Sequence, residues 1–472
     1  MNNSFVSATA FIVYAVILAT IGLLAYRRTH DVSTFILGGR QLSFSVTALS
    51  AGASDMSGWL LLGLPGLAYV SVYESIWVAL GLLVGAYLNW LYVARPLREH
   101  SERLGNALTI PEYFERRFDD KTHILRIVSS ICILAFFIFY TAAGFIAGGK
   151  LFAATFGFSY LNSVILGASL IVIYTSFGGF LAVVWTDALQ AVLMLVALVT
   201  VAAVAIVDGG ANTIGLGLLA GTSHSQEAMP ISNIVVASSL AWGLGYCGQP
   251  HILARFMAIK RSGQLRAARR LATAWSGLAL ACAIAVGFSA RYVLDSSIGN
   301  NDSEKIFIYL IQLLLHPAVA GVCLAAILAA IMSTADSQIL VASTALTHDL
   351  LAKVAPAHAR KLSWHRLAVI FICLLAMTLA LDPRALVLDM VAYAWAGFGA
   401  TIGPCVLMSL YSSRMSMASA LSGIVVGAIV VVGWDRLAGG VFEIYALLPA
   451  LTSSLIAIIV TTKTFPRSPR LA

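Results

Sequence analysis

Long apolar segments recur along almost the whole chain and are separated only by short polar joints. A bilayer-spanning helix needs about 20 mostly apolar residues, and most of these segments reach that length. We expect thirteen membrane helices, over residues 5–26, 43–71, 73–94, 123–150, 160–178, 184–207, 231–257, 270–292, 306–345, 364–382, 386–411, 415–434 and 442–462. The segment at 306–345 is too long for one crossing, so we expect it to begin with a separate outer portion that ends near Pro317.

The composition excludes most other kinds of protein. Of the 472 residues, 60% are apolar and only 11% are charged, against about 25% charged in soluble domains. A disordered chain, a coiled coil and an ordinary soluble enzyme are therefore ruled out. The first segment, 5–26, is longer than the core of a cleavable signal peptide and is interpreted as a membrane helix. The sequence predicts an all-α integral membrane protein embedded in a lipid bilayer.

The net charge of +8 is explained by membrane topology. Lys and Arg accumulate in the cytoplasmic joints of membrane proteins. With the N-terminus outside and an odd number of helices, most of the 29 basic residues lie inside, including clusters at 95–126 and 255–270; those left outside are Lys150, Arg291, Lys305, Arg384 and Arg436. The C-terminus is then cytoplasmic. No basic stretch is interleaved with aromatic residues, so nucleic acid is not an expected partner.

Segment 43–71 carries an acidic residue, Asp55, near the middle of the membrane. Burying a charge there costs about 2.5–3.5 kcal/mol on insertion scales. Its neighbours Gly52, Ser54, Ser57 and Gly58 are poor helix formers. An unwound helix would free backbone carbonyls to bind a small cation. The alternative is a hydrogen-bonded aspartate that braces two helices, and these residues alone leave both roles open.

Segment 231–257 is interrupted by three glycines and a proline between Trp242 and Pro250, which disfavour a continuous helix. The two interrupted segments are the second and the seventh of the thirteen. That spacing predicts an inverted repeat with units at 43–207 and 231–411, flanked by 1–42 and 415–472. Broken helices favour sodium at unwound carbonyls and a substrate carboxylate at helix N-termini. The alternative is a proline kink in a packing helix.

A third polar group lies in segment 306–345. Ser333 and Ser337 share one helix face, and Thr334 and Asp336 flank it. Hydroxyl and carbonyl oxygens suit a small alkali cation, although serine and threonine in membrane helices usually bond back to their own helix.

Four aromatic residues lie near the breaks: Trp59, Tyr140, Trp242 and Tyr246. They have either a packing role or a role as walls of an apolar solute pocket with polar tips.

Longer runs extend these patterns: TALSAGASDMSGW at 47–59, GQPHILARFM at 248–257, and the runs at 37–40, 62–66, 178–183, 185–187, 243–246 and 393–399. With these runs the chain resembles the solute:sodium symporter family, which has the LeuT-type fold, over nearly its whole length. The resemblance is strongest to members that carry L-proline.

The resemblance implies a role for each matching residue. A sodium ion would be held by Ala53, Met56, Ala330, Ser333 and Thr334, with Asp55 and Ser57 beside it. L-Proline would be bound by Trp59, Tyr140, Trp242 and Tyr246, with Pro250 nearby. Arg40 and Asp187 would serve coupling and gating, or alternatively form an interfacial salt bridge or cap. Some relatives bind a further sodium, for which the matching residues are Asp187, Ser333, Asp336 and Ser337.

The expected function is therefore uptake of L-proline coupled to inward sodium movement, by a monomeric secondary transporter of the inner (plasma) membrane with sodium as its only cofactor and no enzymatic activity. The nearest alternative is the same machinery with another amino acid, a sugar or a carboxylate as cargo. A sensor is disfavoured by the short segment after the last helix, an enzyme by the lack of a catalytic constellation, and a passive channel differs in being unable to drive flux uphill.

Overall fold

The computed structural model describes residues 3–209, 232–294, 298, 300–359 and 361–466, and over these ranges the protein is helical with no β-strand. The one extended pairing within them is a single bridge between Leu42 and Ile259. Helices satisfy their own backbone hydrogen bonds, which lipid cannot do for them. The expected all-α class is confirmed.

The helical elements follow one another through short connections. The first part of the chain forms α1 (Asn3–Tyr26), α2 (Val32–Leu37), η1 (Gly38–Arg40), α3 (Phe44–Asp55), η2 (Trp59–Gly63), α4 (Leu64–Val70), α5 (Val72–Leu88), η3 (Asn89–Val93), α6 (Ala94–Arg103), α7 (Ile110–Arg117), α8 (Ile124–Phe156) and α9 (Tyr160–Asp208). The second part forms α11 (Asn233–Ala241), η4 (Trp242–Gly248), α12 (Pro250–Ala258), η5 (Ser262–Gln264), α13 (Leu265–Val293), η6 (Asn300–Lys305), α14 (Ile306–Leu314), α15 (Pro317–Thr344), η7 (Ala345–Leu351), α16 (Ala352–Val354), α17 (Pro356–Ala359), α18 (Leu362–Leu379), α19 (Val387–Tyr411), α20 (Met417–Trp434), η8 (Gly440–Glu443) and α21 (Leu447–Thr464).

Ten helices of the described chain are long and apolar enough to cross a membrane. Each of them overlaps one of the thirteen segments expected from the sequence. The other three expected segments, 43–71, 160–178 and 231–257, are interrupted or short, so length and composition do not identify them as spans. The long segment at 306–345 divides into α14 and α15, and α15 begins at Pro317 as expected.

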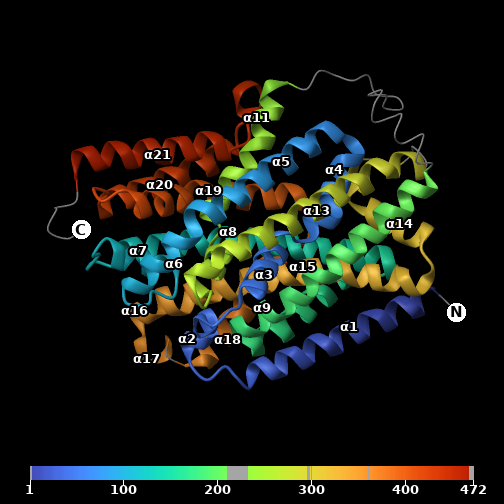
Figure 1. Ribbon diagram of the computed structural model, residues 1–472, viewed down its shortest axis with the longest axis horizontal. Helices are drawn as coiled ribbons and strands as arrows, with labels where there is room; N and C mark the ends of the chain where they lie inside the picture. The colour runs from blue at the N-terminus through green and yellow to red at the C-terminus, as the bar shows by residue number, and fades with distance from the viewer. Residues whose placement is uncertain (1–2, 210–231, 295–297, 299, 360, 467–472) are drawn as a thin grey trace.

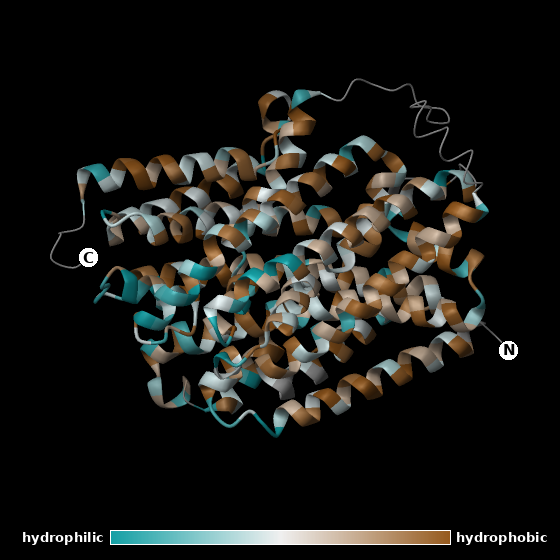
Figure 2. Cartoon of the chain, in the orientation of Figure 1, coloured by the Kyte–Doolittle hydropathy of each residue, from teal (hydrophilic) through white to brown (hydrophobic). Residues whose placement is uncertain are grey.

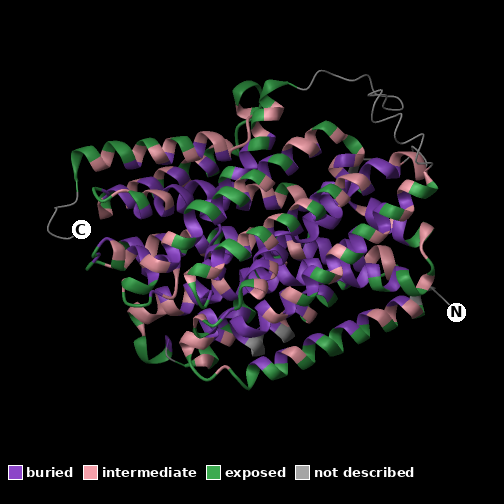
Figure 3. Ribbon diagram, in the orientation of Figure 1, coloured by how far each residue is buried: buried purple, intermediate pink, exposed green. Residues whose placement is uncertain are grey.

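The helices lie roughly along one direction (Figure 1). α1 follows one edge of the molecule, α20 and α21 follow the opposite edge, and α15 lies between them. In the most apolar stretch of the span that begins with α15, 83% of the residues are buried, against 28% in that of α1. Figure 3 shows the buried residues gathered in the interior. Hydrophilic residues gather at the end of the molecule that carries α6 and α7 (Figure 2).

The long element α9 contains a sharp kink at Gly179, where φ is 61° and ψ is −165°. Glycine adopts this conformation without a steric penalty, and a Cβ at this position would lie 2.8 Å from the ring of Phe35. The kink separates the two helices that the sequence analysis expected at 160–178 and 184–207.

The first interrupted segment is unwound where Asp55 ends α3. Met56 has φ −86° and ψ 76°, outside the helical region, and the next helical turn begins at Trp59. At the break the N–H of Ser57 donates to the carbonyl of Asp55 (3.1 Å), and the N–H of Leu60 donates to Ser57 (3.0 Å). The segment is therefore two half-helices, as the glycines and serines around Asp55 predicted.

The second interrupted segment consists of α11, the tight 3₁₀ turn η4 and α12, with Gln249 extended between η4 and α12. One of its glycines, Gly243, is required by close packing against α5. A Cβ on Gly243 would lie 2.0 Å from the carbonyl oxygen of Gly81, and one on Gly85 would lie 2.2 Å from the carbonyl oxygen of Gly243. The interruption is a 3₁₀ turn that ends at one extended residue, Gln249, rather than a simple proline kink.

Candidate functional site

A cluster of oxygen atoms lies between the C-terminal end of α3 and the middle of α15. The hydroxyl of Ser333 donates to the carbonyls of Ala53 (2.9 Å) and Ala330 (3.0 Å), and the hydroxyl of Thr334 donates to Ala53 at 3.4 Å. All four residues are buried. Each hydroxyl oxygen also carries lone pairs, and carbonyl and hydroxyl oxygens are suitable ligands for a hard cation. The structure thus brings together four of the five residues expected to hold sodium.

The fifth residue, Met56, is fully buried at the unwound turn. In a regular helix its carbonyl would accept from the N–H of Leu60, but Leu60 donates to Ser57 instead. The hydroxyl of Ser57 accepts from the N–H of Trp59 at 3.3 Å and so begins the following turn. The backbone at Met56 therefore leaves the helical ladder beside the oxygen cluster.

Asp55 connects the two broken helices. Its Oδ2 accepts a hydrogen bond from the hydroxyl of Tyr246 in η4 (2.6 Å), and its backbone carbonyl accepts from the indole of Trp59 (3.1 Å). Oδ1 has no hydrogen-bond partner among the described residues, although Asp55 is only 3% exposed. Asp55 thus braces two helices through one oxygen, and its other oxygen is available to a ligand.

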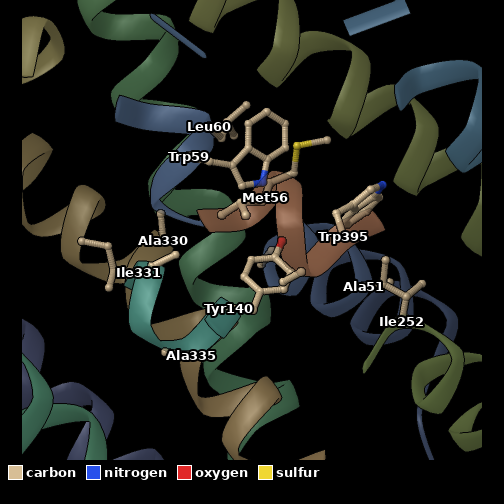
Figure 4. Packing of buried hydrophobic residues seen from close by; sticks show 14 of the residues in the cluster. Ala51, Met56, Trp59, Leu60, Tyr140, Ile252, Ala330, Ile331, Ala335 and Trp395 are labelled. Carbon is tan, nitrogen blue, oxygen red and sulfur yellow. The ribbon is translucent and has the colours of Figure 1, made fainter. Parts of the chain in front are cut away.

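Three of the expected pocket residues gather around this aspartate. Tyr140 reaches the break from α8 and is buried. Figure 4 shows its hydroxyl pointing toward the turn that carries Met56, with the ring of Trp59 beyond it. Tyr140, Trp59 and Tyr246 therefore surround the break in α3 with polar tips and apolar rings.

The other two expected pocket residues make their contacts elsewhere. The ring of Trp242 is stacked on Tyr445, which precedes α21, with ring centroids 5.2 Å apart and planes at 20°. Pro250 begins α12 and lines a small cavity of about 30 Å³ together with residues such as Met257 and Leu340. No described contact joins either residue directly to Tyr140.

Asp187 in α9 is fully buried and is paired with Arg255 of α12, whose Nη2 lies 3.0 Å from Asp187 Oδ2. The same carboxylate oxygen accepts from the hydroxyl of Ser50 (2.6 Å), which also accepts from Arg255 Nε (3.1 Å). Arg255 Nη2 donates to Ser337 of α15 at 2.5 Å. One buried guanidinium thus ties together α3, α9, α12 and α15.

The residues expected for a second cation lie around this guanidinium. The hydroxyl of Ser337 donates to the carbonyl of Ser333 (2.8 Å) and lies 3.4 Å from a carboxylate oxygen of Asp336. Asp187 reaches Ser337 by way of Arg255. A positive charge from the protein itself therefore lies between Asp187 and Ser337.

Arg40, expected to act in coupling, lies in η1. It donates to the carbonyls of Met257 (2.7 Å) and Ala107 (2.8 Å) and to the hydroxyl of Ser101 (3.1 Å). Burial and the nearby charge of Arg98 lower the pKa of Arg40 to about 10. These contacts tie η1 to the end of α12 and to α6, and they do not involve Asp187.

A network of ion pairs closes the same end of the molecule. Arg126 at the start of α8 donates to Asp349 in η7 (2.8 Å) and to Glu115 in α7 (2.6 Å). Asp349 also accepts from Thr109 (2.8 Å), and Glu115 from Lys353 (2.8 Å). The network fastens the end of the helix that carries Ser333 to α7 and α8.

Glu112 of α7 belongs to the same region. It accepts from the N–H of Leu108 (2.7 Å), lies 3.3 Å from the ring of His348, and pairs with Arg116 (2.5 Å). Burial raises the pKa of Glu112, but the hydrogen bond and charge of His348, the amide of Leu108 and the charge of Arg116 together lower it to about 2.

Two residues of this region, Arg255 and Trp395, have no role among the sequence-based predictions. Arg255 was counted among the inner-loop charges, and this was wrong because its side chain is fully buried against Asp187. The available signal was a basic residue inside an apolar segment, opposite a second segment with a lone aspartate. Trp395 lies in a run shared with the family, and its contacts with η4 are visible only in three dimensions.

Comparison with known proteins agrees with this geometry. The sequence model of the sodium:solute symporter family matches residues 35–427. The chain is 45% identical over 460 residues to the sodium/proline symporter of Escherichia coli strain K12, covering 95% of this chain and 91% of that one. It is 42% identical over 469 residues to the sodium/proline symporter of Staphylococcus aureus strain NCTC 8325, covering 95% and 90%.

Two solved structures share the fold. A Na⁺-coupled sialic acid symporter in a substrate-bound outward-open state aligns with a TM-score of 0.81 at 18% identity, over 98% of this chain and 99% of that one. A nucleobase-cation-symport-1 family transporter in a closed conformation aligns with a TM-score of 0.55 at 14% identity, over 93% and 96%.

A multi-pass helical protein with broken helices around a buried oxygen cluster is a secondary transporter rather than an enzyme. The chain belongs to the sodium:solute symporter family.

Proposed function

We propose that this protein couples inward sodium movement to the uptake of L-proline by alternating access. The observation that carries the proposal is the meeting of the Ser333 and Thr334 hydroxyls with the Ala53 carbonyl across the break in α3. An ion at this place would contact two separate helices at once. The assignment of L-proline is supported by relatives 42–45% identical that are named sodium/proline symporters.

In this proposal the sodium ligands are the carbonyls of Ala53, Met56 and Ala330 and the hydroxyls of Ser333 and Thr334. Asp55 and Ser57 support the site from the unwound turn. Sodium would hold α3 against α15 and so favour the conformation in which the solute pocket is formed. The hydrogen bond from Tyr246 to Asp55 offers a direct connection between the ion and the pocket.

The proposed solute pocket is formed by Trp59, Tyr140 and Tyr246, with Trp242 and Pro250 at its margins. L-Proline suits such a pocket because its ring is rigid and apolar. Its carboxylate would be favoured near the positive end of the half-helix α12, and its imino group would bond to a carbonyl or hydroxyl oxygen.

We further propose thirteen membrane crossings with inverted-repeat units at 43–207 and 231–411, flanked by 1–42 and by helices twelve and thirteen at 415–472. The N-terminus would lie outside and the C-terminus in the cytoplasm, in a monomeric transporter of the inner membrane. This arrangement is supported by Figure 1, in which α1 begins and α21 ends at opposite ends of the molecule. Residues 231 and 467–472, at the limits of these units, lie outside the described residues.

Arg40 and Asp187 are proposed as coupling and gating residues. Arg40 holds η1 against the end of α12 at the inner face. Asp187 pairs with Arg255 of the same half-helix in the buried interior. Both residues therefore act on α12, which would have to move for the solute to leave on the inner side.

We propose one sodium ion per solute. A membrane potential of 100 mV is worth about 2.3 kcal/mol per charge, and a tenfold sodium gradient adds about 1.4 kcal/mol. Their sum supports about 500-fold solute accumulation, so a second ion is not needed on energetic grounds.

The competing candidate is a second cation at Asp187, Ser333, Asp336 and Ser337. The sodium dependence of uptake tests it. A Hill coefficient near 1 in the unaltered protein and in Asp336→Ala supports one sodium, whereas a coefficient near 2 that falls to 1 in Asp336→Ala supports the second site.

The cargo is tested by competition against labelled L-proline in proteoliposomes that contain the purified protein. We expect unlabelled L-proline to displace the label at low concentration, and other amino acids, sugars and carboxylates to do so only at far higher concentration. Displacement by one of those solutes at lower concentration than L-proline would retain sodium-coupled symport and reassign the cargo.

A further inference from the structure

Trp395 of α19 is buried against the 3₁₀ turn η4 of the second broken helix. Its indole Nε1 donates to the backbone carbonyl of Trp242 at 2.8 Å. Its ring meets the ring of Tyr246 edge to face, with centroids 5.0 Å apart and planes at 90°. Figure 4 shows Trp395 beside the break in α3, on the side away from Ala330.

The backbone of η4 fits closely around this indole. A Cβ on Gly245 would lie 2.1 Å from Trp395 Nε1, so that position accepts only glycine while the tryptophan is in place. The side-chain amide of Gln249 donates through Nε2 to the carbonyl of Gly245 (3.1 Å) and lies 3.4 Å from the carbonyl of Trp395. Side-chain and backbone groups of α19 thus contact both the start and the end of η4.

A 3₁₀ turn such as η4 has poorer hydrogen-bond geometry than an α-helix and is uncommon over more than three or four residues. Lipid offers no further donors to its backbone carbonyls. The indole of Trp395 supplies an additional donor to the carbonyl of Trp242. Its stiff ring also limits where the ring of Tyr246 can lie, and the hydroxyl of Tyr246 bonds to Asp55.

We propose that Trp395 is a positioning residue that holds η4 in its 3₁₀ form and orients Tyr246 toward Asp55. This role rests on the proposed sodium-coupled transport of L-proline for its functional meaning, whereas its structural part does not depend on the cargo. Trp395 acts through η4 and is not assigned a contact with the solute.

The test uses Trp395→Phe, which keeps an aromatic ring and removes the indole N–H. Trp434→Phe is the matched control, because the indole of Trp434 also donates to a backbone carbonyl, that of Ile444 at 2.9 Å, while its own ring packs on Phe442 and not on a residue of η4. Both variants are compared with the unaltered full-length protein in proteoliposomes at equal protein content.

The deciding readout is the reaction of Cys247 with a maleimide, followed by peptide mass spectrometry. Cys247 is a buried free thiol within η4 itself. We expect it to react several-fold faster in Trp395→Phe and at an unchanged rate in Trp434→Phe. An unchanged rate in Trp395→Phe, or an equal increase in both variants, would overturn the proposal.

Transport gives the second readout. We expect the apparent KM for L-proline to rise at least fivefold in Trp395→Phe, with kcat altered less than twofold. The reason is that the pocket residue Tyr246 is displaced while the protein stays folded. Equal losses of kcat in both variants with no change in KM would contradict a positioning role. Absence of L-proline uptake in the unaltered protein would count against the proposed function and would leave the Cys247 measurement valid.

Discussion

At the scale of single residues, the hydroxyl of Ser333 is the group on which the proposed sodium site depends most directly, since it contacts carbonyls of both α3 and α15. We predict that Ser333→Ala raises the sodium concentration for half-maximal uptake about tenfold, because a buried ligand and hydrogen bond are lost. Ser343→Ala is the control: its hydroxyl is buried in the same helix and bonds only back to Leu340 among described partners. Equal sodium dependence in the two variants would contradict the assignment.

The residue scale also shows what sequence reasoning can reach. Asp55, Ser333 and Thr334 stand out as candidates because a polar group in an apolar segment is costly and needs a reason. The role of Arg255 was missed because its partner Asp187 is 68 residues away, and no local pattern pairs them. Trp395 was missed for the same reason, since its partner Trp242 is 153 residues away.

At the scale of elements, the 3₁₀ turn η4 depends on close backbone packing against α5. A Cβ on Gly243 would lie 2.0 Å from a backbone oxygen of Gly81, which cannot rotate away as a side chain can. We predict that Gly243→Ala strongly reduces the amount of folded protein in the membrane, whereas Gly263→Ala, with open space around it, does not. Immunodetection in membrane fractions measures both, and normal levels of Gly243→Ala would show that the backbones of η4 and α5 are not in such close contact.

A second element-scale prediction concerns the ion pairs of Glu112 in α7. The folded pKa of Glu112 is about 2, below its ordinary value of 4.5, so its ion pairs stabilise the folded state above about pH 4.5 and lose this effect as the pH falls toward 2. Glu112→Gln should therefore lower the stability of the detergent-solubilised protein by about 1–3 kcal/mol at pH 7.

The pH dependence of Tm checks this prediction. The difference between Glu112→Gln and the unaltered protein should be constant from pH 7 to about pH 5 and should shrink below that. Glu102→Gln is the control, because Glu102 is 57% exposed beside Arg98 and an exposed pair contributes little. A difference that grows on acidification would be inconsistent with the lowered pKa.

The breaks in the helices were predictable where glycine and proline interrupt an apolar segment. The glycines around Asp55 and between Trp242 and Pro250 predicted both breaks, because glycine and proline disfavour continuous helix. The polar joint between the expected helices at 73–94 and 123–150 was expected to be a connection, yet α7 and nearly all of α6 form helices there. Their stability comes from ion pairs and packing at this end of the molecule, and no apolar run in the sequence indicates these contacts.

At the scale of the whole molecule, the all-α class followed from apolar run lengths alone, whereas the relative positions of the helices did not. The segments at 43–71 and 231–257 are far apart in the sequence, and nothing local indicates that Asp55 meets Tyr246. Such contacts depend on packing between helices separated by many residues. The roles of these residues stay predictions from the family resemblance, and the structure gives their geometry.

The central claim, sodium-driven uphill transport of L-proline, is tested most directly by labelled L-proline uptake into proteoliposomes with and without an inward sodium gradient. At an interior-negative potential of 100 mV and a tenfold gradient, one sodium per solute predicts an upper limit of about 500-fold accumulation. We predict accumulation above the external concentration only with the gradient, and its loss in Asp55→Asn. Uptake that stops at the external concentration, or that proceeds equally well without sodium, would contradict the account.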